Sequence, residues 1–161
     1  GRGDVYERSF EPARGTVVLV KVDEGVSTAA AYKAFDDMGG SAFGASNDAT
    51  ENASDLPLFN NLAAASECVL PKLAEAREWL SSRQGIAHDA SGAAKVLLCG
   101  SGSATFAVVE ESDSIRKAAD IVAAAKLKGY WARSCSFASI GVKVLDGAGS
   151  GSNLGAPRKI W

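Results

Sequence analysis

KVLLCGSGSATFAVVEE, residues 95–111, holds two apolar runs separated by a short stretch of glycine and serine. The runs Ala94–Cys99 and Ala104–Glu110 are rich in β-branched, aromatic and other apolar residues, which is typical of strands. Between them lies Gly100-Ser101-Gly102-Ser103. Glycine tolerates the positive φ values that tight turns require. The stretch therefore predicts two paired strands joined by a glycine turn, a β-hairpin.

The same glycines raise the question of a phosphate-binding loop. A dinucleotide fingerprint needs GxGxxG between a strand and a helix. Here the third glycine is missing and the following residues, Ala104–Val109, read as a strand, so that function is excluded. Two interpretations stay open. The loop is a plain turn, or its N–H groups and the hydroxyls of Ser101 and Ser103 face an anion, since four small residues exceed what a tight hairpin needs.

The amino-terminal part predicts a strand, a helix and a long loop. The β-branched run at Thr16–Val22 is typical of a buried strand. After a turn at Asp23–Val26, Ser27 is a candidate N-cap for an alanine-rich helix that Gly39 can end. Residues 40–55 are small and polar and are expected to form a loop.

Two helices are expected next. Asp55 and Pro57 favour a helix start, and apolar residues at helical spacing predict its buried face: Leu58, Leu62, Ala65 and Val69. Pro71 interrupts this helix because an interior proline loses a hydrogen bond and clashes with the preceding turn. In the second helix, three residues are expected to point inward: Leu73, Ala76 and Leu80.

The last helix begins at Ser112 or Asp113 and ends near Gly129, with an apolar stripe formed by Ile115, Ala118, Ala119, Val122 and Ala125. Tyr130–Phe137 is expected to be a strand, and Val142–Leu145 is expected to extend the sheet. The order β-α-α-α-β-β-α-β predicts an α+β fold, a mainly antiparallel four-stranded sheet with helices packed on one face, in a ferredoxin-like order.

Composition narrows the class of protein. The chain has 161 residues, enough for one domain, and a net charge of −2, which argues against a nucleic-acid partner. No apolar run is long enough for a membrane helix. Three widely spaced cysteines and one histidine argue against a metal site. We expect a cytoplasmic protein with reduced, mostly buried cysteines, buried Trp79 and Trp131, and a solvated His88.

Leu98–Val108, LCGSGSATFAV, resembles the third conserved motif of the GHMP small-molecule kinases, M-S-G-S-G-P-T-x-F-A. Five residues match it directly: Gly100, Ser101, Gly102, Phe106 and Ala107. Leu98-Cys99 and Ser103-Ala104 depart from the pattern.

Three further stretches resemble this family. Gly25–Asp36 is similar to its g-v-S-T-x-x-a-Y segment, and Leu58–Leu80 to its helix pair with Asn-Asp-Leu-Glu, although Ala63 stands where a glutamate is usual. Gly1–Asp4 resembles the hinge G-R-G-E. The matches favour the branch that phosphorylates a diphosphocytidyl-linked methylerythritol in non-mevalonate isoprenoid synthesis. Residues 1–145 are then the carboxy-terminal, substrate-side domain, and 146–161 a flexible tail.

The resemblance implies ATP- and Mg-dependent phosphoryl transfer to a hydroxyl of a small-molecule substrate. The phosphate loop, the catalytic Asp and its Lys partner belong to the family's amino-terminal half, which we expect to be this chain's partner. We therefore expect no catalytic residue, no metal site, no tightly bound cofactor and negligible turnover in this chain alone.

The resemblance also implies which residues of this chain form a site. Gly100, Ser101, Gly102 and Ser103 would lie beside the substrate and the transferred phosphate. The turn Asp23–Thr28 would face the rest of the substrate, with Ser27 and Thr28 as contacts, although helix capping is an equal interpretation of Ser27. Two alternatives remain: another branch, such as a homoserine or mevalonate-type kinase, and a stand-alone α+β binding domain.

Overall fold

The computed structural model describes residues 13–40 and 58–138, and within them it contains four strands and four helices. Their order is β1 (Thr16–Lys21), α1 (Thr28–Asp37), α2 (Ala63–Val69), α3 (Lys72–Ser81), β2 (Val96–Leu98), β3 (Ala104–Val108), α4 (Ser114–Leu127) and β4 (Trp131–Ser136). This order is the predicted one. Four predicted features lie outside the described residues: the loop beyond residue 40, the helix start at Asp55 and Pro57, the extension of the sheet at Val142–Leu145, and the tail.

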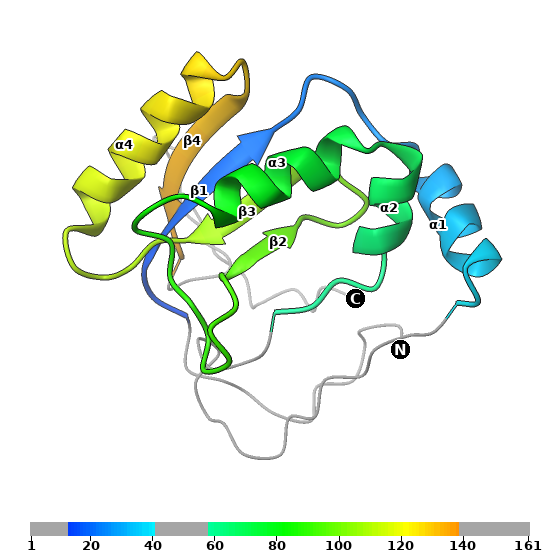
Figure 1. Ribbon diagram of the computed structural model, residues 1–161, viewed down its shortest axis with the longest axis horizontal. Coiled ribbons are helices and arrows are strands. Elements are labelled where there is room, and N and C mark those ends of the chain that lie inside the picture. The colour runs from blue at the N-terminus through cyan, green and yellow to red at the C-terminus, as the bar shows by residue number, and fades with distance from the viewer. Residues whose placement is uncertain (1–12, 41–57, 139–161) are drawn as a thin grey trace, which may run out of the picture.

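The four strands form one antiparallel sheet in the order β2-β3-β1-β4. The hairpin of β2 and β3 pairs Leu98 with Thr105, and the inner strand β1 pairs with β3 and β4. Helices α3 and α4 contact one face of this sheet. Helix α1 packs on α2, and this pair lies beyond the end of the sheet (Figure 1). The predicted α+β fold is confirmed.

The core lies between the sheet and these two helices. Val18 and Val20 of β1 are at most 1% exposed and pack with Leu80 of α3 and Ile121 of α4. Burying each such side chain contributes roughly 1.5–3 kcal/mol to folding. A smaller cluster of Val22, Leu73, Ala76 and Leu98 lies nearer to the glycine loop. The inward orientation predicted for Leu73, Ala76 and Leu80 is confirmed.

The apolar face predicted for the first of the two central helices is wrong in part. Helix α2 begins at Ala63, and Leu58 lies before it, 42% exposed. The chain turns at Asn60, whose Oδ1 accepts a hydrogen bond from Leu62 N–H at 2.9 Å, so Leu58 is out of helical phase. Val69 in the last turn is also 42% exposed. The helix instead buries Ala65 and Ser66.

The stripe predicted on α4 is shifted around the helix. Ile115 is 84% exposed and Ala119 is exposed, whereas Ala118, Ile121 and Ala125 are buried. These three lie three and four residues apart, on one side of a helix with 3.6 residues per turn. Ile115 falls outside that arc because each step of three residues is about 60° short of a full turn, which places Ile115 well around the helix from Ile121 and Ala125.

Two further expectations concern cysteines and membranes. All three cysteines are free, as expected, but Cys68 and Cys99 are exposed, so the expectation that most are buried is wrong. Cys68 lies on the outer side of α2, and Cys99 follows the last residue of the edge strand β2. In the part of the chain that the structure describes, no helix has both the length and the apolar character needed to span a bilayer.

Thr105 in β3 offers a test of core polarity. Its side chain is 1% exposed, and its Oγ1 has no hydrogen-bond partner among the described residues. A buried hydroxyl without a partner costs free energy, so we expect Thr105→Val to raise the free energy of unfolding by about 1 kcal/mol. Urea denaturation followed by circular dichroism measures this change.

Thr16→Val is the matched control on the neighbouring strand. Thr16 Oγ1 donates a hydrogen bond to Ser114 Oγ at 3.1 Å, so the same change removes a satisfied hydroxyl. We expect it to lower the free energy of unfolding by about 0.5–1 kcal/mol. An equal loss in both variants would contradict the unpaired state of the Thr105 hydroxyl.

Candidate anion-binding site

The glycine stretch forms the turn of the β2–β3 hairpin, as predicted. Cys99 N–H donates to the Ala104 carbonyl at 2.8 Å, and Gly102 N–H donates to the Cys99 carbonyl at 2.9 Å. Gly100 has a φ of 56° and Gly102 a φ of 98°. Residues with a side chain rarely adopt such positive φ values, so the backbone conformation of the loop favours glycine at both positions.

Close packing also disfavours a side chain at position 102. A Cβ atom there would lie 3.1 Å from Leu73 Cδ1, closer than ordinary van der Waals contact. The next residue, Ser103, accepts a hydrogen bond from Val22 N–H at 3.3 Å through its carbonyl oxygen. The loop therefore rests on α3 on one side and is bonded to the end of β1 on the other.

The second predicted segment is the turn that leads from β1 into α1. Ser27 is the N-cap of α1, and its Oγ accepts a hydrogen bond from Ala30 N–H at 3.4 Å. The capping interpretation of Ser27 is thus confirmed, while its contact with a substrate stays a prediction. Thr28, the first residue of the helix, is exposed.

The fold brings the two predicted segments together. Thr28 Oγ1 and Ser101 Oγ lie 3.1 Å apart, within hydrogen-bond distance, although 73 positions separate them in the sequence. One hydroxyl donates to the other, and both groups retain capacity for a further hydrogen bond. The glycine loop and the start of α1 therefore line one small polar site.

Asn60 is a residue of this site that the sequence did not single out for a role. Its Nδ2 group donates to the Leu98 carbonyl at 2.9 Å and to the Gly100 carbonyl at 2.7 Å. The available signal was the resemblance of Asn60-Asn61-Leu62 to the Asn-Asp-Leu pattern. This resemblance pointed to the Asn60 position, but only the structure shows that its side chain binds the hairpin carbonyls.

Lys72 of α3 holds the acidic start of the same turn. Its ammonium group donates a hydrogen bond to the Glu24 carboxylate and lies 4.0 Å from that of Asp23. The hydrogen bond with Glu24, followed by its charge, raises the pKa of Lys72. The contact offsets negative charge that would repel an anion at Thr28 and Ser101.

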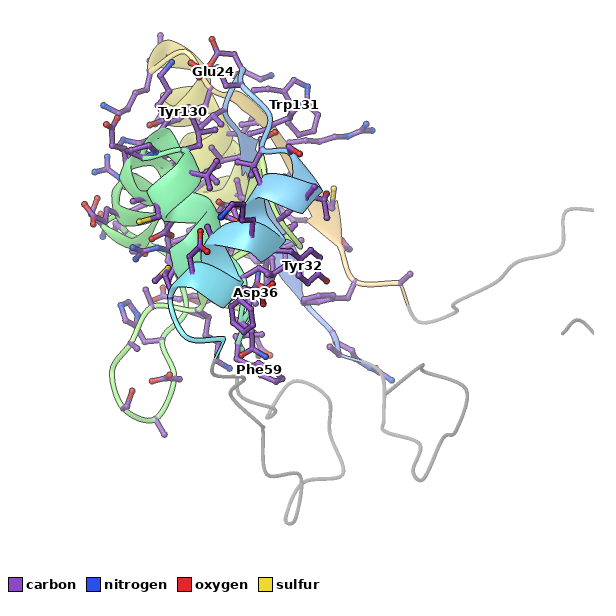
Figure 2. All side chains as sticks on the ribbon, turned by 90° about the vertical axis from the view of Figure 1, so that its right-hand side faces the viewer. Glu24, Tyr32, Asp36, Phe59, Tyr130 and Trp131 are labelled. Atoms are coloured by element: carbon purple, nitrogen blue, oxygen red, sulfur yellow. The ribbon has the colours of Figure 1, made fainter. Side chains whose placement is uncertain are left out.

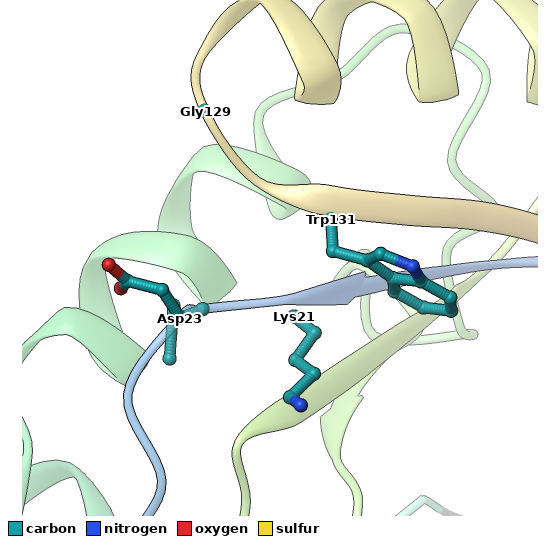
Figure 3. Close-up of a pocket in the computed structure, with 5 residues that line it drawn as sticks. Lys21, Asp23, Gly129 and Trp131 are labelled. Carbon is teal, nitrogen blue, oxygen red and sulfur yellow. The ribbon is translucent and has the colours of Figure 1, made fainter.

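A hollow lies at the same end of the sheet, lined by residues that include Lys21, Asp23, Gly129 and Trp131 (Figure 3). Lys21 pairs with Ala104 on one side and with Trp131 on the other, so the hollow adjoins the strand that follows the glycine loop. Trp131 is 54% exposed, which corrects the expectation of burial. It faces away from the helices because Ala132, the next residue of β4, takes the inward position.

The expectation of an exposed His88 is confirmed, whereas Trp79 is half-buried and not fully buried. Trp79 packs against the core, with its ring centroid 5.5 Å from that of Tyr130, and His88 is exposed. Figure 2 shows Tyr130 and Trp131 at the same end of the molecule as Glu24. Among the described residues, no three His, Cys, Asp or Glu side chains gather closely enough to hold a metal ion.

The polar groups of the site are of the kind that donate hydrogen bonds to an anion. Its groups are the hydroxyls of Thr28 and Ser101 and the backbone of the loop, which a ligand can approach closely at the two glycines because they have no side chain. The loop Gly100–Ser103 contains no carboxylate or imidazole that could accept a proton from a reacting hydroxyl. This arrangement can bind and orient a phosphate group.

Comparison with known proteins identifies the class of protein. Residues 41–128 match the family described as GHMP kinases C terminal, which spans more than half of the chain. The chain therefore belongs to the GHMP kinase family through its carboxy-terminal domain, in agreement with the resemblance seen in the sequence.

The most informative relatives share one activity in their names. The 4-diphosphocytidyl-2-C-methyl-D-erythritol kinase of Desulfitobacterium hafniense (strain Y51) is 34% identical over 113 residues, which cover 65% of this chain and 36% of that protein. A crystal structure of 4-(cytidine 5'-diphospho)-2C-methyl-D-erythritol kinase has the same fold, with a TM-score of 0.59 and 23% identity, over 85% of this chain and 47% of that one. The chain thus spans less than half the length of either relative.

Proposed function

We propose that this chain is the substrate-side, carboxy-terminal domain of an ATP-dependent kinase that phosphorylates a hydroxyl of 4-diphosphocytidyl-2-C-methyl-D-erythritol in the non-mevalonate route to isoprenoids. The family membership and the named relatives support this function. The observation that carries it is the 3.1 Å contact of Thr28 Oγ1 with Ser101 Oγ. It joins two segments that independently resemble the kinase family.

In this function, Gly100, Ser101, Gly102 and Ser103 lie beside the substrate and the transferred phosphoryl group. Ser27 and Thr28 face the cytidyl or erythritol portion. Phosphoryl transfer depends on positioning the reactants and on neutralising the triphosphate. ATP and Mg belong to an amino-terminal half that acts as the partner of residues 1–145, in the cytoplasm.

The chain alone is then expected to bind weakly and to have negligible turnover, because the proton acceptor for the substrate hydroxyl and the cradle for the triphosphate belong to that other half. Two alternatives predict different behaviour. A homoserine or mevalonate-type kinase domain would bind a different small alcohol. A stand-alone α+β domain with a structural hairpin would bind none of these ligands at the glycine loop.

The proposal predicts a ligand-specific change at the glycine loop. We expect millimolar 4-diphosphocytidyl-2-C-methyl-D-erythritol to shift the backbone amide NMR signals of Thr28 and of Gly100–Ser103 in the ¹⁵N-labelled chain. Mevalonate and homoserine, at the same concentration, are expected to leave them in place. The amides of α4, which packs behind the sheet, report any non-specific effect in the same spectra.

An activity assay extends this test to catalysis. A chimaera joins the amino-terminal part of the Desulfitobacterium hafniense relative to this chain, and ATP consumption is measured with each of the three alcohols. Consumption with mevalonate or homoserine alone would overturn the choice of branch. If the chimaera folds and is inactive with all three, and no ligand shifts the loop, the structural hairpin is the correct interpretation.

A further inference from the structure

Asn60 lies between the glycine loop and the start of α2 and is bonded to both. Its amide nitrogen donates to two carbonyl oxygens of the hairpin, Leu98 at 2.9 Å and Gly100 at 2.7 Å. Its amide oxygen accepts from Leu62 N–H at 2.9 Å. One half-buried side chain makes all three bonds. The amide orientation is consistent, because carbonyls can only accept and an N–H can only donate.

These bonds fix the direction of one peptide group in the loop. The N–H and C=O of a trans peptide point in opposite directions. Because the Gly100 carbonyl points at Asn60, the Ser101 N–H that belongs to the same peptide points away from it. Among the described residues, this N–H has no hydrogen-bond partner. Ser101 thus offers an N–H and a hydroxyl on a loop whose glycines let a ligand approach.

We infer that Asn60 is the positioning residue of this loop: by binding the Leu98 and Gly100 carbonyls, it turns the Ser101 N–H outward as a donor to a phosphate group. The inference deepens the proposed function and rests on it for the identity of the ligand. Asn60 does not touch the reacting atoms. It acts through the conformation of Gly100–Ser103.

A simpler role is that Asn60 only stabilises the start of α2 through the bond from Leu62. Asn60→Asp separates the two roles, because aspartate keeps an oxygen acceptor for Leu62 N–H and loses both donors to the hairpin. Its carboxylate would also repel the two carbonyl oxygens. Asn61→Asp is the matched control, since it adds the same charge one residue further along the chain.

The first readout needs no ligand. Gly102 N–H is bonded to the Cys99 carbonyl and reports whether the loop holds its shape. In the whole 161-residue chain, we expect Asn60→Asp to speed hydrogen exchange at Gly102 by about tenfold or more relative to the strand amides, because the variant loses both hydrogen bonds to the hairpin. Asn61→Asp is expected to leave the ratio within about twofold. Asn60→Ala provides the same measurement should the aspartate variant fail to fold.

The second readout is binding of cytidine 5'-diphosphate, followed by the Ser101 amide signal. We expect Asn60→Asp to weaken this binding by about fivefold or more, and Asn61→Asp to weaken it less. Unchanged exchange at Gly102, or unchanged affinity in Asn60→Asp, overturns the positioning role. If the unsubstituted chain shows no shift with the nucleotide while exchange at Gly102 responds, the loop-holding role stands and the proposed ligand falls.

Discussion

Gly102→Ala is expected to lower the free energy of unfolding by about 3 kcal/mol and to distort the candidate site. The φ of 98° costs a residue with a side chain about 1–2 kcal/mol. The added methyl group would also lie 3.1 Å from Leu73 Cδ1, and overpacking of this kind costs typically 1–3 kcal/mol. Urea denaturation of the whole chain measures the sum.

Two variants separate these causes. Gly129 has a similar φ of 91° but no atom within 4 Å of an added Cβ, so Gly129→Ala is expected to show the backbone cost alone. In a double-mutant cycle, Leu73→Ala removes the clashing methyl groups, and Gly102→Ala should cost about 1–2 kcal/mol less in that background. Equal costs for the two glycines would show that contact with Leu73 does not constrain the loop.

Leu80→Ala is expected to destabilise the fold by about 3 kcal/mol. Leu80 is fully buried in the cluster that joins α3 and α4 to β1. Removing its branched end leaves a cavity, and substitutions of this type cost roughly 2–5 kcal/mol. The measurement is again the midpoint and slope of a urea transition.

Leu127→Ala is the control for the leucine side chain itself. Leu127 is the last residue of α4 and is 91% exposed, so its replacement is expected to change the free energy of unfolding by less than about 0.5 kcal/mol. A loss in Leu127→Ala close to that in Leu80→Ala would mean that this surface is covered in solution, contrary to the exposure seen here.

The hairpin could be predicted because its signals are local. Two apolar runs flank a glycine turn, and neither depends on residues far away in the sequence. The same holds for Ser27 at the start of α1 and Gly129 after α4, since caps act within one turn. These elements and their order were sufficient to predict the class of fold.

The expectations that failed concern which face is covered. Trp131 and Ile115 are apolar residues that the pattern assigned to the core, and both are exposed because neighbouring residues face the sheet or helix instead. Burial is a property of two packed elements, so the periodicity of one element leaves a choice that packing decides.

The sequence by itself determined the order of elements, the glycine turn and the family, because these depend on residues close together in the chain. Only the tertiary structure decided that Thr28 meets Ser101 and that Asn60 holds the Leu98 and Gly100 carbonyls. Such contacts join segments tens of residues apart, and they form when β1, α2 and the hairpin pack together. The site is therefore a product of the fold, built from residues whose local patterns carry no sign of one another.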